Sequence, residues 1–187
     1  MAMEVGKSQL LLFSLLILLT SCEKNSFEKG IEKFNQEAYE EAIAEFTNYI
    51  ETHPRHEQSY YNRGRSYEKI GQLEKAVDDY GQAVELDPLE ITYRMSSGLV
   101  NFRLKNFGQV VLDMNAVVKK NPNLAQAYYI RGRALVKEGR GKDAMESYNT
   151  AINHNADYSE VYLHRGILKV LIDDTSSGCQ DLRKAAN

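Results

Sequence analysis

The sequence contains no tryptophan, three prolines and two cysteines among 187 residues, and its net charge is only −3. Two cysteines cannot build the disulfide framework of a small secreted domain. So few prolines, with 12 glycines, exclude a collagen-like or linker-rich chain. A net charge this close to zero argues against a protein that binds nucleic acid mainly by electrostatic attraction. The remaining composition, 43% hydrophobic and 26% charged, is that of an ordinary folded domain.

The scarce prolines and several glycines recur at a fixed distance of 34 residues. They are Pro54, Pro88 and Pro122, and Gly30, Gly64, Gly98, Gly132 and Gly166. Small residues recur at the same step: Ala42, Ala76, Val110, Ala144 and Gly178. Four residues after each of these comes a large one: Phe46, Tyr80, Met114, Tyr148 and Leu182. Because a spacing of four is helical, each repeat is predicted to contain two helices that cross closely at the glycine.

The second repeat reads Tyr60-x2-Arg63-Gly64-x2-Tyr67, then Ala76-x3-Tyr80, then Pro88. This pattern resembles the tetratricopeptide repeat, which has the same length. The resemblance covers a domain at 22–187, with repeats at 23–56, 57–90, 91–124, 125–158 and 159–187. It implies an all-α fold, a right-handed α-α superhelix or solenoid of five stacked helical hairpins.

An apolar run at residues 10–19 follows Lys7 and precedes small residues. Ten apolar residues are too few to span a bilayer, which needs about 20, and the layout is that of a signal peptide. The segment Leu19-Thr20-Ser21-Cys22 resembles the bacterial lipobox. This resemblance implies that residues 1–21 are a cleaved lipoprotein signal peptide and that Cys22 carries the lipid. The alternative is an ordinary signal peptide that happens to contain a cysteine.

The lipoprotein resemblance places the chain in the cell envelope, with its lipid anchor in a membrane. In lipoproteins of enterobacterial type, Asp after the lipidated cysteine favours the inner membrane. Here the residue is Glu23, which favours the periplasmic face of the outer membrane. Asn25-x2-Glu28 then predicts a capping box at the start of the first helix, close to Cys22.

The other residues with possible chemistry do not form a site in the sequence. Cys179 belongs to a 34-residue column whose other members are apolar, and it is expected in the core. The histidines lack metal-ligand spacing and are interpreted as solvated turn residues: His53, His56, His154 and His164. No phosphate loop, nucleophile elbow or zinc motif is present. The sequence predicts no enzyme activity, no catalytic residue, no cofactor and no metal.

In tetratricopeptide proteins the first helix of each hairpin lines an inner groove that holds a peptide or a partner helix. The matching positions in the middle repeats are Tyr61, Arg65, Lys69, Met95, Leu99, Arg103, Tyr129, Arg133 and Lys137. Aromatic residues with arginines are typical of binding hot spots. They would suit a partner segment with acidic and apolar side chains. Alternatively, these residues pack neighbouring helices together and their charges are merely solvated.

Charge is unevenly divided among the repeats. The first two carry 8 basic and 16 acidic residues, a net −8, whereas the third and fourth carry 10 basic and 5 acidic, a net +5. The basic middle is not accompanied by a motif of a known nucleic-acid-binding module, so nucleic acid is not the expected partner.

We therefore expect a non-enzymatic scaffold for protein–protein interactions, lipid-anchored in the bacterial envelope, that binds a protein or peptide segment in its groove. Two alternatives stay open. In one, the uncapped fifth repeat stacks on a second copy, which gives a self-associating homodimer. In the other, the chain is a regulatory adaptor for an envelope enzyme. The sequence does not separate them.

Overall fold

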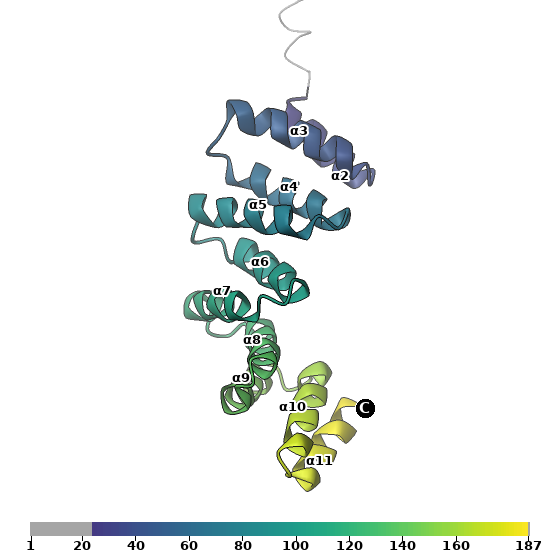
Figure 1. The fold of residues 1–187 in the computed structure, drawn as a ribbon, viewed down its shortest axis with the longest axis vertical. Helices are drawn as coiled ribbons and strands as arrows, with labels where there is room; N and C mark the ends of the chain where they lie inside the picture. Colours follow the sequence, from purple (N-terminus) through teal and green to yellow (C-terminus); the bar gives the residue numbers. More distant parts are fainter. Residues whose placement is uncertain (1–23, 187) are drawn as a thin grey trace, which may run out of the picture.

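The computed structural model describes residues 24–186, which form ten α-helices arranged as five hairpins, without a strand in that range (Figure 1). The first helices of the hairpins are α2 (Ser26–Asn35), α4 (Glu57–Lys69), α6 (Ile91–Arg103), α8 (Ala125–Lys137) and α10 (Ser159–Leu171). The second helices are α3 (Tyr39–Thr52), α5 (Leu73–Leu86), α7 (Phe107–Lys120), α9 (Gly141–His154) and α11 (Thr175–Ala185). The predicted all-α solenoid is confirmed.

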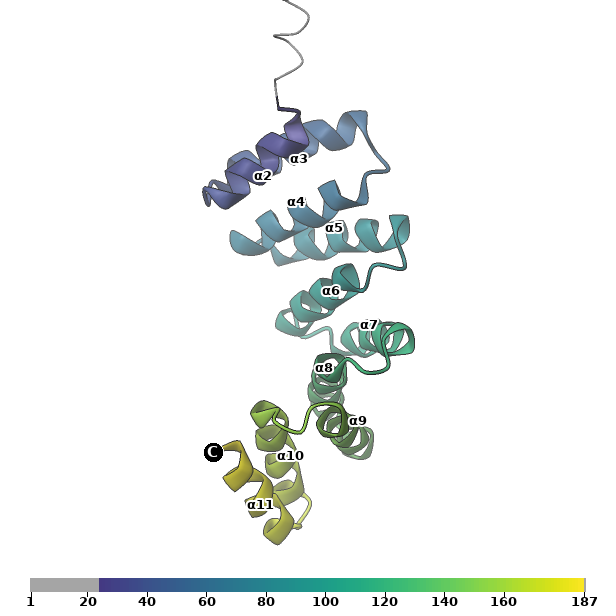
Figure 2. The same cartoon turned by 180° about the vertical axis from the view of Figure 1, so that it is seen from behind.

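The hairpins stack in chain order, from α2 and α3 at one end to α10 and α11 at the other (Figures 1 and 2). Each helix packs against the helix before and after it. Among the contacts between consecutive hairpins, the one between α9 and α10 is the smallest. At this junction Ala156 stands where the three earlier turns have proline, two residues after α3, α5 and α7 end.

The glycine column lies where the two helices of a hairpin cross. A Cβ placed on Gly30 or Gly132 would lie 2.6 Å from the ring of Phe46 or Tyr148. Both rings are buried, and their distance from the glycine backbone leaves no room for a methyl group. Each glycine costs about 1 kcal/mol because glycine is a poor helix former. Its missing Cβ allows a large side chain of the other helix to pack directly against the backbone. This part of the sequence prediction is confirmed.

Inside each hairpin the chain turns through one residue with positive φ. These residues follow the 34-residue step: Glu37 (60°), Gly71 (77°), Lys105 (64°), Gly139 (75°) and Asp173 (67°). The turn ends the first helix as a left-handed C-terminal cap does, with the N–H groups of Gly71 and Gln72 donating to the carbonyls of Glu68 and Tyr67. Glycine is the residue best suited to this position.

Helix α2 begins where the sequence predicts. The Glu28 N–H donates to Asn25 Oδ1 at 2.9 Å and the Asn25 N–H donates to the Glu28 carboxylate at 3.3 Å, which forms the capping box. The predicted signal peptide at 1–21 and the lipidation site Cys22 lie outside the described residues. Among the helices of residues 24–186, none is both long and apolar enough to cross a membrane.

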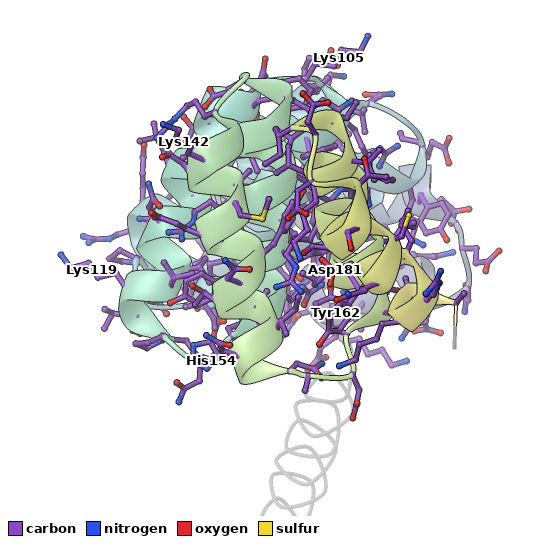
Figure 3. The ribbon with its side chains drawn as sticks, turned by 90° about the horizontal axis from the view of Figure 1, so that it is seen from below. Lys105, Lys119, Lys142, His154, Tyr162 and Asp181 are labelled. Carbon is purple, nitrogen blue, oxygen red and sulfur yellow. The ribbon has the colours of Figure 1, made fainter. Side chains whose placement is uncertain are left out.

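Cys179 is a free thiol on α11, and it is half-buried rather than in the core. This corrects the prediction from its column. The same position is also half-buried at Ile43, Val77 and Met145, so this column lies at the edge of the core in most hairpins. Figure 3, which looks along the stack from this end, labels Tyr162 of α10 and Asp181 of α11. On the other side of this view, Lys142 and His154 mark the two ends of α9.

Candidate functional site on the first helices of the hairpins

The residues predicted to line the groove lie on α4, α6 and α8, and we name their surface the helix-A face. Four of them are exposed: Lys69, Leu99, Arg103 and Lys137. Four are half-buried: Tyr61, Arg65, Met95 and Arg133. Tyr129 is buried, which places it in the core beneath the surface and not at the surface itself. The structure therefore divides this set into accessible charges and supporting aromatic or apolar residues.

Two arginines of the helix-A face stack on phenylalanine rings of the preceding hairpin. The guanidinium carbon of Arg65 lies 4.4 Å from the ring centroid of Phe34, and that of Arg133 lies 4.6 Å from Phe102. Such stacking contributes about 0.5–1 kcal/mol at exposed sites and fixes the plane of the guanidinium. Among the described residues no carboxylate pairs with either arginine, so both present N–H donors in a defined orientation.

Arg103 is bound differently from Arg65 and Arg133. Its Nη1 lies 2.9 Å from Glu68 on α4, and Glu68 also accepts a hydrogen bond of 3.0 Å from the Tyr80 hydroxyl. Burial raises the pKa of Tyr80, with the Glu68 charge adding to the effect. Arg103 thus already has a carboxylate partner, Glu68, within the array. The sequence analysis places Arg103 among the groove residues and does not predict this pairing with Glu68.

The tyrosines of the helix-A face mainly support their neighbours. Tyr129 packs against Tyr158, with ring centroids 5.1 Å apart, and against His164 at 5.6 Å. Burial raises the pKa of Tyr129. Tyr61 packs in the same way against Tyr93 at 4.9 Å. These rings hold the hairpins together below the arginines, as the alternative interpretation of the sequence suggested for them.

His164 has a pKa that is affected by charged residues of the helix-A face. It lies half-buried on α10 beside Tyr129, and it is not the solvated turn residue that the sequence suggested. Burial lowers the pKa of its imidazole most, and the positive charges of Arg133 and Lys137 lower it further. The charges of α8 therefore act on the pKa of a side chain in the next hairpin, where Glu160 of α10 opposes them.

On α10 the same positions become apolar. Leu163, Ile167 and Leu171 follow Tyr129, Arg133 and Lys137 by 34 residues and are 42%, 44% and 72% exposed. We name these three the apolar end of the helix-A face. Large apolar side chains are therefore exposed on α10. The helix-A face thus changes from basic to apolar along the stack.

The described residues contain no group of three or more histidine, cysteine or acidic side chains placed to hold a metal ion. The chemistry that this surface offers is cationic donors, stacked rings and exposed aliphatic side chains. Such a surface can bind a segment of another molecule through charge and apolar contact.

Sequence comparison identifies tetratricopeptide repeats in two parts of the chain, at residues 57–88 and 113–160. Over 96 residues, 51% of the chain, it is 31% identical to the Hsp70-Hsp90 organizing protein 1 of Glycine max, and covers 17% of that protein. Over 124 residues, 63% of the chain, it is 26% identical to the mitochondrial import receptor subunit TOM70 of Homo sapiens, and covers 20% of it. The chain thus spans a fifth or less of the length of these relatives.

Solved structures of similar fold include MamA and YrrB. The MamA crystal structure has a TM-score of 0.80 at 20% identity and covers 84% of this chain and 92% of its own. YrrB, described as a TPR protein with an unusual peptide-binding site, has a TM-score of 0.77 at 17% identity, with coverages of 86% and 82%. At these identities the likeness concerns the fold alone, and the shared fold is an α solenoid.

Proposed function

We propose that this array of tetratricopeptide repeats is a non-enzymatic scaffold that binds an acidic and apolar segment of a partner protein on its helix-A face. Repeats of this kind mediate contacts between proteins. One observation carries the proposal: Arg65 and Arg133 are held on phenylalanine rings without a carboxylate partner among the described residues, on a surface that ends in exposed leucine and isoleucine.

In the free array, stacking on phenylalanine already orders the guanidinium groups of Arg65 and Arg133. A stacked guanidinium loses less conformational freedom on binding a carboxylate than a mobile one does. Lys69 and Lys137 lie four residues after Arg65 and Arg133, so each arginine has a second cation on the same side of its helix. Acidic side chains of the partner would therefore meet α4 and α8, and its apolar side chains would meet Leu163, Ile167 and Leu171 on α10.

The proposal is tested with labelled extended peptides and fluorescence anisotropy. The set contains peptides with a glutamate block before or after a leucine block, the same peptides with lysine for glutamate, and glutamate–serine peptides. We expect one of the two glutamate–leucine orders to bind more tightly than every other peptide, with an affinity that falls as salt rises. Equal binding of the lysine peptide, or no binding by either glutamate–leucine order, would contradict the proposal.

We also propose that Cys22 anchors the scaffold in the bacterial envelope, on the periplasmic face and in the outer rather than the inner membrane. The support is the sequence Leu19-Thr20-Ser21-Cys22 behind a ten-residue apolar run. Lipidation with several acyl chains gives stable anchoring, because each buried methylene contributes about 0.8 kcal/mol. Replacing Cys22 by Ser should move the protein from the membrane pellet to the soluble periplasmic fraction. Continued sedimentation of the Ser variant with outer membranes would contradict lipid anchoring.

A second candidate function, self-association, is favoured by the apolar end. Leu171 of the apolar end is 72% exposed and the adjacent Ile172 is 60% exposed, so a second copy that covered both would remove apolar surface from water. Leu171→Glu should then shift sedimentation from dimer to monomer, whereas Lys142→Glu on α9 should not. A monomer at every concentration of the unaltered chain would exclude this candidate and leave the apolar end to a partner segment.

A further inference from the structure

Three arginines on the side of the first helices opposite the helix-A face have the same orientation in their repeats. Arg131 is two residues before Arg133, which places it about 200° around α8. Each of the three lies over the tyrosine three residues before it: Arg63 over Tyr60 at 5.6 Å, Arg131 over Tyr128 at 5.0 Å, and Arg165 over Tyr162 at 5.4 Å. The guanidinium edge that carries Nε and Nη2 points to the residue 16 positions later in each repeat.

In the second and fifth repeats that residue is aspartate. Arg63 donates from Nε and Nη2 to the two oxygens of Asp79 at 2.8 and 2.7 Å. Arg165 donates to the two oxygens of Asp181 at 2.7 and 2.7 Å. These are two-point bonds between a planar guanidinium and a planar carboxylate, the geometry for which arginine is best suited. Both pairs lie largely out of water.

In the fourth repeat the corresponding residue is Ser147. Its hydroxyl accepts from Arg131 Nε at 3.1 Å, and Asn115 Oδ1 accepts from Nη1 at 3.1 Å. No side chain of the described residues accepts from Arg131 Nη2, the atom that meets the second carboxylate oxygen in the other two repeats. Serine lacks that oxygen. The fourth repeat therefore keeps the arginine side of the pair and lacks its carboxylate.

A pocket of about 190 Å³ lies beside this incomplete pair. Its apolar wall is formed by Val111 and Leu135, both nearly inaccessible to water. Its polar lining includes Asn115, Arg131 and Ser147. Arg140 and Asp143 also line the pocket and form an ion pair, in which Arg140 donates to the Asp143 carboxylate at 2.6 and 2.8 Å.

Glu146 also lines the pocket and adds a negative charge at its rim. The lining therefore contains two arginines and two acids, so the pocket has no net charge. A ligand with several negative charges gains little from such surroundings. A singly charged group gains the two-point bond to Arg131 without a large repulsion.

We propose that the pocket beside Arg131 is a binding site for a single carboxylate on a short aliphatic chain. The carboxylate would take the place that Asp79 and Asp181 occupy beside Arg63 and Arg165, and the aliphatic part would lie against Val111 and Leu135. Two sources have this chemistry: a free short-chain monocarboxylate and the side chain of a partner's glutamate. The site is separate from the helix-A face and does not depend on the function proposed for that face.

The test uses the folded chain, with propionate for the free ligand and N-acetyl-glutamate-N-methylamide for the side chain. Binding is followed by the NMR signal of Arg131 Nε–H at constant ionic strength, with propionamide and sulfate as controls. We expect saturable binding of at least one carboxylate, and at least tenfold weaker binding of propionamide and sulfate. The tighter of the two carboxylates identifies the source.

Two variants at one position separate site binding from a general salt effect. Ser147→Asp places a carboxylate beside Arg131 as in the second and fifth repeats, and it should weaken ligand binding at least tenfold. Ser147→Ala removes the hydroxyl without adding charge and should retain binding within about threefold. If Ser147→Asp does not fold, Arg131→Gln takes its place, with loss of binding at Val111 and Leu135 methyl signals as the readout. No saturable binding to the unaltered chain, or equal binding to Ser147→Asp, would overturn the proposal.

Discussion

Arg63 and Arg65 are two residues apart on α4 and differ in what holds them. Arg63 is bound in two-point geometry by Asp79 of its own hairpin, and the two side chains are only 17% and 6% exposed. Arg65 lies over Phe34 of the preceding hairpin and has no carboxylate partner among the described residues. The same residue type thus pairs with a carboxylate on one side of the helix and has no carboxylate partner among the described residues on the other.

The comparison extends along the stack. On α8, Arg133 repeats the arrangement of Arg65, with Phe102 beneath it, whereas Arg131 has Ser147 where Arg63 has Asp79. The number of basic residues on a surface therefore says little about whether it can bind an acidic ligand. What decides it is whether a carboxylate of the same array already meets each cation, as Glu68 meets Arg103.

The largest expected effect comes from exchanging the two arginines of α4 for glutamine, one at a time. Arg63→Gln leaves Asp79 buried without its cation and should lower the free energy of unfolding by about 3 kcal/mol. Arg65→Gln loses one exposed stacking contact and should cost about 0.5–1 kcal/mol. Urea denaturation followed by circular dichroism measures both. Equal losses of unfolding free energy in the two variants would contradict the distinction between the paired Arg63 and the stacked Arg65.

A smaller effect is expected at Asp113, where the third repeat has the acid without the two-point arginine. Ser97 donates to it at 3.0 Å and Gln109 at 3.1 Å, while Arg94 is 3.9 Å away. Burial raises the pKa of Asp113, and these hydrogen bonds only partly oppose the rise. Asp113→Asn should therefore leave the free energy of unfolding at pH 7 unchanged or raise it by up to about 1 kcal/mol.

The sign of the pH dependence follows from the raised pKa of Asp113. Its protonated form is favoured in the folded chain, so this stabilising contribution is present below the unfolded pKa of about 3.9 and is lost as pH rises through the higher folded pKa. The advantage of Asp113→Asn over the unaltered chain should therefore shrink as pH falls toward about 4. A loss of stability in this variant at pH 7 that shrinks as pH falls through a folded pKa below about 3.9 would show instead that the carboxylate is needed as a charge.

The smallest expected effect is on the titration of His164. Arg133 and Lys137 lower the pKa of this imidazole in addition to burial. Arg133→Gln should raise the pKa measured by NMR, and Lys119→Gln on the distant side of the stack should leave it unchanged. An unchanged pKa in Arg133→Gln would mean that the cations of α8 do not act on the next hairpin.

Much of the fold could be predicted from single positions that recur. Gly132 and Pro88 belong to columns whose spacing fixes both the hairpins and their turns, and the structure confirms these. The sequence also contains a second glycine series, Gly71 and Gly139, which are two 34-residue steps apart. Both lie at the positive-φ turn inside a hairpin. The sequence interpretation missed it because three of the five positions carry Glu37, Lys105 and Asp173.

The helix-A face, the proposed binding surface, could be predicted only in outline. The positions of Arg65 and Arg133 follow from the repeat, but their stacking on Phe34 and Phe102 depends on how successive hairpins rotate. The pairing of Arg103 with Glu68, 35 residues away, depends on the same rotation. The burial of Tyr129 depends on Tyr158, the N-cap residue of α10, and on His164 of α10. These contacts arise between repeats, where no local spacing specifies them.

The most direct test of the central claim is the dissociation constant of the tighter glutamate–leucine peptide, measured by calorimetry for two double variants with the same loss of charge. Arg65→Gln with Arg133→Gln removes the stacked cations of the helix-A face. Lys119→Gln with Lys142→Gln removes two exposed cations of α7 and α9, on the side marked in Figure 3. We predict at least roughly tenfold weaker binding for the arginine pair and less than about twofold for the lysine pair. Equal weakening by the two pairs would contradict the account, because binding would then follow net charge and not the arginines held on phenylalanine.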